Sequence, residues 1–136
     1  MIENRELLNL KGKTAIVTGA VGIGFGIAYR LAEAGVSVVL ASLYQEEAEE
    51  SVQKLTEKGF TATAVRCDVS CEEEVRKMVE ETVSSYGAID ILVNNAGIYP
   101  LIPISKMTTT DFEKVIDVNL KGVFLCTKYV LSLIHI

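Results

Sequence analysis

Short apolar runs alternate along this chain with longer stretches in which apolar residues recur at helical spacing. The runs are rich in β-branched residues and are bounded by glycine or polar residues, which is typical of strands. They cover residues 13–18, 36–41, 60–67 and 89–93. The stretches that follow them predict helices over residues 22–34, 45–58 and 70–86, and from residue 108 onward.

Start and stop signals support these helices. Gly35, Gly59 and Gly87 each follow the last periodic residue of a predicted helix, where a left-handed glycine commonly ends one. Ser70 and Glu73 have the spacing of a capping box, and Thr108 is placed to cap the last helix. The inner face of that last helix is predicted to comprise Phe112, Val115, Ile116, Leu120, Val123 and Phe124.

Strand and helix repeat four times, at a spacing typical of right-handed βαβ crossovers and a parallel sheet. The second strand is apolar on both faces, as expected for a strand buried between two helix layers. We therefore predict an α/β fold: a Rossmann-type doubly wound parallel sheet, truncated to about four strands in the order 3-2-1-4, with helices on both faces. Ligands of such a sheet bind at the carboxyl ends of the first and fourth strands, where the winding direction reverses.

Composition narrows the class of protein. With 136 residues, 49% of them hydrophobic and 23% charged, the chain can form one globular core. A net charge of −5 argues against nucleic-acid and anionic-membrane partners, which need a basic surface. The cysteines at 67, 71 and 126 form neither a disulfide framework nor a zinc pattern, so we expect no metal and a reducing compartment. Since the sequence shows no secretory signal and no run of about 18 apolar residues, we expect a cytoplasmic location.

The chemistry is concentrated where strands end. The stretch TAIVTGAVGIGFGIA runs from the first strand through glycines 19, 22, 24 and 26 into a helix. A glycine turn before a helix start lets the backbone approach a phosphate, toward which the first-turn N–H groups point. Such turns also serve plain strand–helix packing, so this signal is weak by itself.

Ser42, Asp68 and the segment Asn95–Ala96–Gly97 follow the other three strands, so the sheet should bring them to the same edge as the glycine turn. This shared position favours a nucleotide site. The alternative is that they are ordinary turn residues, because turns prefer these residue types.

At these residues the chain resembles the short-chain dehydrogenase/reductase family. Four motifs carry the resemblance, in order: residues 19–24 resemble its glycine loop, 67–69 its adenine-contacting junction, 94–97 its Asn-Asn-Ala-Gly signature, and 118–122 the segment with its catalytic asparagine. The resemblance covers residues 10–130 and implies a partial dinucleotide-binding domain over residues 1–130.

The resemblance also implies roles. Gly19 belongs to the glycine loop, and backbone N–H groups of Gly22, Ile23 and Gly24 would meet a pyrophosphate. Asp68 would accept from the adenine amino group beside the Val69 backbone. Ser42 would lie at the adenosine ribose, and Asn95, Ala96 and Gly97 at the cofactor ribose. Asn119 would hold a water in a proton relay, with a locally bonded helix residue as the alternative, and Asn94 would tie neighbouring strands together.

Two features depart from the family pattern. The glycine loop is one residue short, so either the helix start slips or the loop changes shape. Ser42 also stands where an acid would select NAD and a nearby base NADP, and Leu43 and Tyr44 follow it, so the cofactor is NAD or NADP.

The family's catalytic Tyr-x-x-x-Lys is not found, because none of the tyrosines at 29, 44, 86, 99 and 129 has lysine four residues on. We expect the N-terminal part of an NAD(P)-dependent oxidoreductase that acts on a small alcohol or carbonyl compound, inactive as given. The resemblance implies a homo-oligomer paired through the last helix. The alternatives are a non-catalytic nucleotide-binding or interaction module and, less favoured, a methyltransferase.

Residues 131–136 are expected to be a non-native tail. Their back-translation resembles a transposase end sequence used in sequencing libraries, and the alternative is a genuine apolar helix end. His135 is assigned no role on either interpretation.

Overall fold

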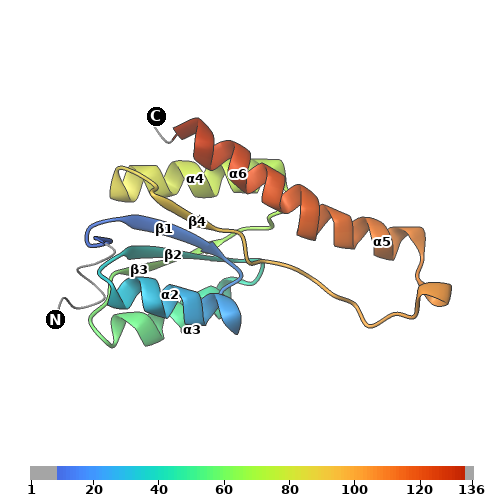
Figure 1. The fold of residues 1–136 in the computed structure, drawn as a ribbon, viewed down its shortest axis with the longest axis horizontal. Helices are drawn as coiled ribbons and strands as arrows, with labels where there is room; N and C mark the ends of the chain where they lie inside the picture. Colours follow the sequence, from blue (N-terminus) through green and yellow to red (C-terminus); the bar gives the residue numbers. More distant parts are fainter. Residues whose placement is uncertain (1–8, 134–136) are drawn as a thin grey trace.

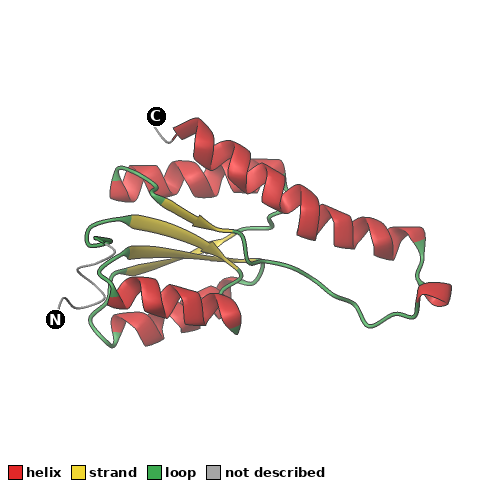
Figure 2. Ribbon diagram, viewed as in Figure 1, coloured by secondary structure: helices red, strands yellow, loops and turns green. Residues whose placement is uncertain are grey.

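The computed structural model describes residues 9–133 and has a four-stranded parallel sheet at its centre. The strand order is β3-β2-β1-β4, as predicted. The strands are β1 (Thr14–Thr18), β2 (Ser37–Ser42), β3 (Ala62–Arg66) and β4 (Ile91–Val93). Helices α2 (Ile23–Glu33) and α3 (Gln45–Thr56) cover one face, and α4 (Glu72–Tyr86) and α6 (Gly122–Leu133) cover the other (Figures 1 and 2).

The sheet separates two hydrophobic cores because successive strand residues point to opposite faces. In β1, Ala15 and Val17 pack toward α2 and α3, whereas Ile16 packs with Val75 and Met78 of α4. Every residue of β1 is buried, as expected for a strand covered on both sides. The register, in which Ile16 pairs with Val39 on one side and Leu92 on the other, aligns the carboxyl ends of the strands along one edge.

The observed ends of the helices confirm most of the start and stop signals predicted from the sequence. Gly35, Gly59 and Gly87 have φ of +88°, +82° and +83°, the left-handed conformation expected after a helix. Thr108 caps α5 (Thr109–Ile116), since its hydroxyl accepts from the Asp111 N–H while the Asp111 carboxylate accepts from the Thr108 N–H.

The capping box predicted from Ser70 and Glu73 is wrong. Helix α4 begins at Glu72, with Cys71 at its N-cap and no side-chain cap. The Ser70 hydroxyl instead donates to the Asp68 carboxylate at 2.6 Å. This bond within the turn after β3 replaces the helix cap that the sequence pattern predicted for Ser70.

The predicted inner face of the last helix is also wrong. That helix is divided into α5, a π-helical turn (η2, Asp117–Lys121) and α6, and it follows a loop containing the short 3₁₀ helix η1 (Ile104–Lys106). Phe112 and Leu120 are 54% and 63% exposed, because the segment from 97 to 121 projects away from the sheet (Figure 1). Phe124, in α6, is 61% exposed. We call residues 97–121 the arm. Of the other three positions, Ile116 and Val123 are exposed and Val115 is half-buried, whereas Leu125, Cys126 and Val130 fill the core.

The expectation of a non-native tail over residues 131–136 stays a prediction. Leu10 packs against one of the two cores, and Leu131–Leu133 continue α6. The remainder of the expected tail, including His135, lies outside the described residues. Within residues 9–133, no helix combines the length and the apolar character needed to cross a membrane.

Candidate functional site

The carboxyl ends of all four strands surround one cavity of about 260 Å³. Six of the predicted site residues line it: Gly19, Ser42, Asp68, Val69, Ala96 and Gly97. Gly22, Ile23 and Gly24 lie beside it at the start of α2, and Asn95 and Asn119 hold its neighbouring loops. The sheet therefore brings the separate sequence motifs to a single rim.

The turn between β1 and α2 is closed so tightly that only glycine fits. Gly19 has φ of +85°, and a Cβ on Gly24 would lie 1.8 Å from the Gly19 carbonyl oxygen and 2.7 Å from Asn95 Nδ2. Since such distances are far inside van der Waals contact, glycine at 24 allows the helix start to touch the preceding turn. This close approach is the feature a phosphate-binding turn requires.

The glycine loop, which is one residue shorter than the family pattern, takes a shape that still leads directly into α2. Gly22, at φ of +57°, is the N-cap of α2 and turns the chain directly into the helix, and the Gly26 N–H donates to its carbonyl at 3.2 Å. The Ser51 hydroxyl of α3 anchors the loop by donating to the Ala20 carbonyl at 2.8 Å. The N–H groups of the first turn, including Ile23 and Gly24, have no intrahelical acceptors, as at any helix start, and lie at the end of α2 that follows the glycine turn.

Thr18 joins β1 to the loop after β4. Its hydroxyl oxygen accepts the N–H groups of Asn95 and Ala96, each at 3.1 Å, and donates to the Val93 carbonyl at 3.3 Å. Sequence reasoning did not assign Thr18 a role, although its position directly before Gly19 was a usable signal.

Asn95, and not Asn94, ties the two strands together, which corrects the prediction. The Asn95 amide donates to the carbonyls of Thr18 at 2.9 Å and Gly19 at 3.3 Å. Asn94 donates to Thr127 of α6 at 3.2 Å. The reason is strand geometry, in which consecutive side chains point to opposite faces.

Asp68 is held in one orientation on the cavity wall. Its Oδ1 accepts from the Ser70 N–H at 2.9 Å and from the Ser70 hydroxyl, while its own N–H donates to Glu74 at 2.7 Å. The bond from Asp68 and the ion pair with Arg66 lower the pKa of Glu74, so this carboxylate stays ionised and fixes the junction. Within the described part of the chain, Oδ2 of Asp68 accepts no hydrogen bond.

Two other side chains near the rim, those of Cys67 and Asn119, are constrained by the protein around them. Burial raises the pKa of the Cys67 thiol to about 12, so the thiol is neutral and a poor nucleophile at pH 7. Asn119 exchanges two bonds of 2.8 Å with the backbone of Ile98, which fastens the arm's helix to the loop after β4.

The π-helical turn around Asn119 was not predicted. Its wide turn is closed by the Gly122 N–H donating to the Asp117 carbonyl. A Cβ on Gly122 would lie 2.8 Å from Val69, so a glycine here lets α6 approach the junction after β3. This contact links two of the four motifs, and π-turns are frequent at functional sites.

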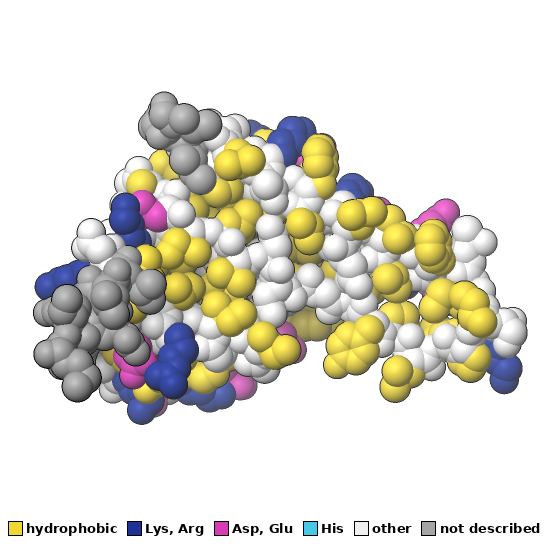
Figure 3. Space-filling view, in the orientation of Figure 1, with side chains coloured by type: hydrophobic (Ala, Val, Ile, Leu, Met, Phe, Trp, Pro, Cys, Tyr) yellow, Lys and Arg dark blue, Asp and Glu magenta, His cyan; other side chains and the backbone are white. Residues whose placement is uncertain are grey.

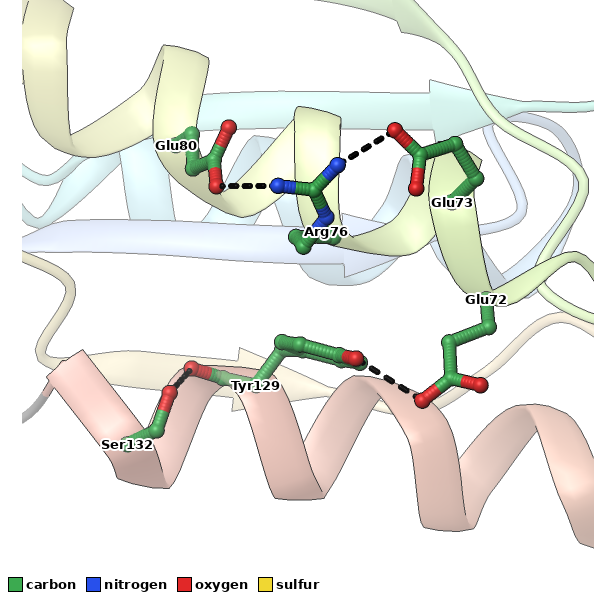
Figure 4. A network of polar contacts seen from close by, with 6 residues as sticks. All are labelled: Glu72, Glu73, Arg76, Glu80, Tyr129 and Ser132. Carbon is green, nitrogen blue, oxygen red and sulfur yellow. Dashed lines mark hydrogen bonds and ion pairs between the residues drawn. The ribbon is translucent and has the colours of Figure 1, made fainter.

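A polar contact fixes α6 against α4, away from the cavity. The Tyr129 hydroxyl and Lys128 Nζ both donate to Glu72 at 2.8 Å, as Figure 4 shows for the tyrosine. Lys128 and Tyr129 thereby lower the pKa of Glu72. Among the residues that the structure describes, no three His, Cys, Asp or Glu side chains are grouped to hold a metal ion.

Comparison with known sequences places these motifs in a family. A profile of the short chain dehydrogenase family matches residues 13–135. An uncharacterized oxidoreductase of Thermotoga maritima is 42% identical over 121 residues, which are 88% of this chain and 47% of that protein. A 3-oxoacyl-(acyl-carrier-protein) reductase FabG of Staphylococcus aureus is 43% identical over 116 residues, or 84% of this chain and 47% of that one. The chain spans about half the length of the curated relatives it matches.

Solved structures agree with the sequence comparison. A short chain dehydrogenase from Mycobacterium smegmatis matches with a TM-score of 0.87 and 35% identity, over 91% of this chain and 53% of that one. A short-chain type dehydrogenase/reductase from Mycobacterium marinum matches with a TM-score of 0.91 and 32% identity, over 97% and 54% of the two chains. On its sequence, its strand order and its motif positions, this chain belongs to the short chain dehydrogenase family.

Proposed function

We propose that this chain is the cofactor-binding part of an NAD(P)-dependent oxidoreductase that acts on a small alcohol or carbonyl compound. The observation that supports it is the convergence of the glycine turn and the ends of β2, β3 and β4 on one cavity. Family members generally use NAD(P), and a doubly wound sheet binds dinucleotides at this edge.

The rim offers suitable groups for such a cofactor. The first-turn N–H groups of Gly22, Ile23 and Gly24 would hold the pyrophosphate, and Asp68 Oδ2 would accept from the adenine amino group beside Val69. Ala96 and Gly97 would face a ribose, positioned by Asn95 and Thr18. When bound, a nicotinamide cofactor supplies the hydride that passes to or from the substrate carbon.

The acid/base chemistry of the reaction would come from outside these 136 residues, because no tyrosine here has lysine at the fourth following position. We assign Asn119 a place in the proton relay through the widened backbone of its π-helical turn, with its side chain holding Ile98. The isolated chain should therefore bind cofactor and show no turnover.

We also propose that two copies of the full protein pair through the long helix that ends this chain, which comprises α5 and α6. The exposed apolar residues of the arm and of α6 support this role, among them Phe112, Leu120 and Phe124. The partner in that interface would be a second copy, as the family resemblance implies.

A thermal melt of the purified chain tests the proposed site. NAD⁺ or NADP⁺ at about 100 times its Kd should raise Tm by about 5 °C or more. Asp68→Asn should weaken binding about tenfold, because the amide presents a donor where adenine needs an acceptor. The control Asp117→Asn changes an exposed carboxylate in the arm and should leave binding unchanged. Stabilisation by S-adenosylmethionine instead of either dinucleotide would refute the assignment.

A further inference from the structure

Ser42 and Glu47 form a hydrogen-bonded pair on the wall of the cavity. Ser42 is the last residue of β2, and its hydroxyl donates to Glu47 Oε2 at 3.0 Å. The same hydroxyl oxygen accepts the Tyr44 N–H at 3.3 Å. Glu47 lies in the first turn of α3, five residues after Ser42, and both residues line the cavity.

These bonds determine what the pair can offer a ligand. A serine hydroxyl has a single hydrogen to donate, and here it is directed at Glu47, which as a carboxylate can only accept. What remains toward the cavity is a lone pair of Ser42 and the other lone pairs of Glu47. The pair therefore presents acceptors and a negative charge, and no donor.

The rest of the cavity wall carries no cationic side chain. Among the described residues that line it there are two carboxylates, Glu47 and Asp68, one phenol, Tyr44, and no lysine or arginine. Proteins bind phosphate groups through cations and N–H or O–H donors, most often arginine. Since β2 ends where the adenosine ribose of a dinucleotide lies, this wall faces the 2′ position.

We propose that the Ser42–Glu47 pair makes this site select NAD(H) over NADP(H). A 2′-hydroxyl can donate to the acceptors of the pair, whereas a 2′-phosphate would face the Glu47 carboxylate, and the pair has no hydrogen left to donate to it. This inference rests on the proposed function. Sequence reasoning left the cofactor open because it looked for an acid at the end of β2, while the acid comes from the next helix.

Isothermal titration of the 136-residue chain with NAD⁺ and NADP⁺ at the same low salt tests the proposal. The wild-type chain should bind NADP⁺ on the order of 100-fold more weakly than NAD⁺, as expected for like charges held close at a partly exposed site. Glu47→Gln should reduce that preference about tenfold, since it removes the charge, adds a donor and keeps an acceptor for Ser42. Glu46→Gln, an exposed change of the same charge in the same helical turn, is the matched control and should leave the preference unchanged.

The outcomes separate the two proposals. Equal binding of the two dinucleotides, or a preference for NADP⁺, would overturn the inference and leave the dinucleotide site standing. An NAD⁺ preference that Glu47→Gln does not alter would also overturn it, because selectivity would then arise elsewhere. Failure of both dinucleotides to bind would overturn the proposed function itself, and the inference with it.

Discussion

The rim at the strand ends and the arm meet at residues 96–98 but are held in opposite ways. At the rim, Thr18, Ser51 and Asn95 each bond backbone groups of another segment, and the turn at Gly24 is in direct backbone contact. In the arm, the Thr108 capping box is local to α5, and the Asn119 bonds to Ile98 join the arm to itself.

The apolar residues of the two regions differ in the same way. Apolar residues of the four strands pack into two cores, whereas hydrophobic side chains lie exposed over the arm (Figure 3). The exposed residues of the arm include Leu101, Ile104 and Phe112. A helical stripe of apolar residues therefore predicts that a face will be covered, and it does not say whether the cover comes from the same 136 residues.

The largest effect is expected at the closed turn of the rim. Gly24→Ala places a methyl group against the Gly19 carbonyl, so it should lower the free energy of unfolding by about 3 kcal/mol or more, or prevent folding. Gly26→Ala, in the same helix with open space around it, should raise stability by about 0.5–1 kcal/mol. Urea unfolding of both variants measures this difference, and equal effects would show that the turn is loose.

Two neighbouring residues of α6, one in the core and one on the exposed face, allow their contributions to stability to be compared directly. Leu125 is 3% exposed, so Leu125→Ala should cost about 2–5 kcal/mol of unfolding free energy. Phe124→Ala removes a mostly exposed ring and should stay within about 0.5 kcal/mol of wild type in dilute solution. If Phe124→Ala proved as destabilising as Leu125→Ala, the exposed side of α6 would have a partner within the chain.

Removing the Thr18 hydroxyl tests the link between β1 and β4. Thr18→Val keeps the shape but leaves the N–H groups of Asn95 and Ala96 without their acceptor, which should cost about 1–3 kcal/mol. Thr18→Ser keeps the hydroxyl and should lower the free energy of unfolding by less than Thr18→Val does. Urea unfolding provides the comparison, and a Val variant as stable as the Ser variant would contradict the assigned role.

The smallest effects concern acid stability. Lys13 and the Thr14 N–H lower the pKa of Asp90, which is part of the sheet region, and the Thr108 hydroxyl and N–H lower the pKa of Asp111 in the arm. A carboxyl group whose pKa is lower in the folded state than in the unfolded state stabilises the fold at pH values above its unfolded pKa of about 4. This stabilisation is lost as the pH falls through the folded pKa.

Asp90→Asn should therefore lower the global midpoint of urea unfolding at pH 7, with the deficit shrinking as the pH falls below about 4. Asp111→Asn should reduce amide-exchange protection within α5 and leave the global midpoint nearly unchanged, because α5 packs mainly on the adjoining π-helical turn. A global loss from the Asp111 variant equal to that from Asp90 would remove the distinction between the two regions.

The sequence predicted the sheet order and the meeting of the motifs because both follow from strand–helix alternation and the direction of parallel strands. It gave the strand-tying role to Asn94 instead of Asn95, since that role depends on which way each side chain points beyond β4. It missed Thr18, Glu47 and the π-helical turn for a related reason. Their partners are chosen by three-dimensional packing, which residue types and spacing alone do not determine.

The central claim is that the strand carboxyl ends form one dinucleotide-binding rim, and amide chemical shifts during a titration with NAD⁺ test it most directly. The account predicts shifts concentrated at Gly19, residues 22–24, Ser42, Asp68 and Gly97. A second cavity of about 240 Å³, between the edge strand β3 and the C-terminal half of α4, is lined in part by Thr63, Ser85 and Tyr86 and serves as an internal control. Shifts confined to that second cavity, or no shifts at saturating NAD⁺, would contradict the account.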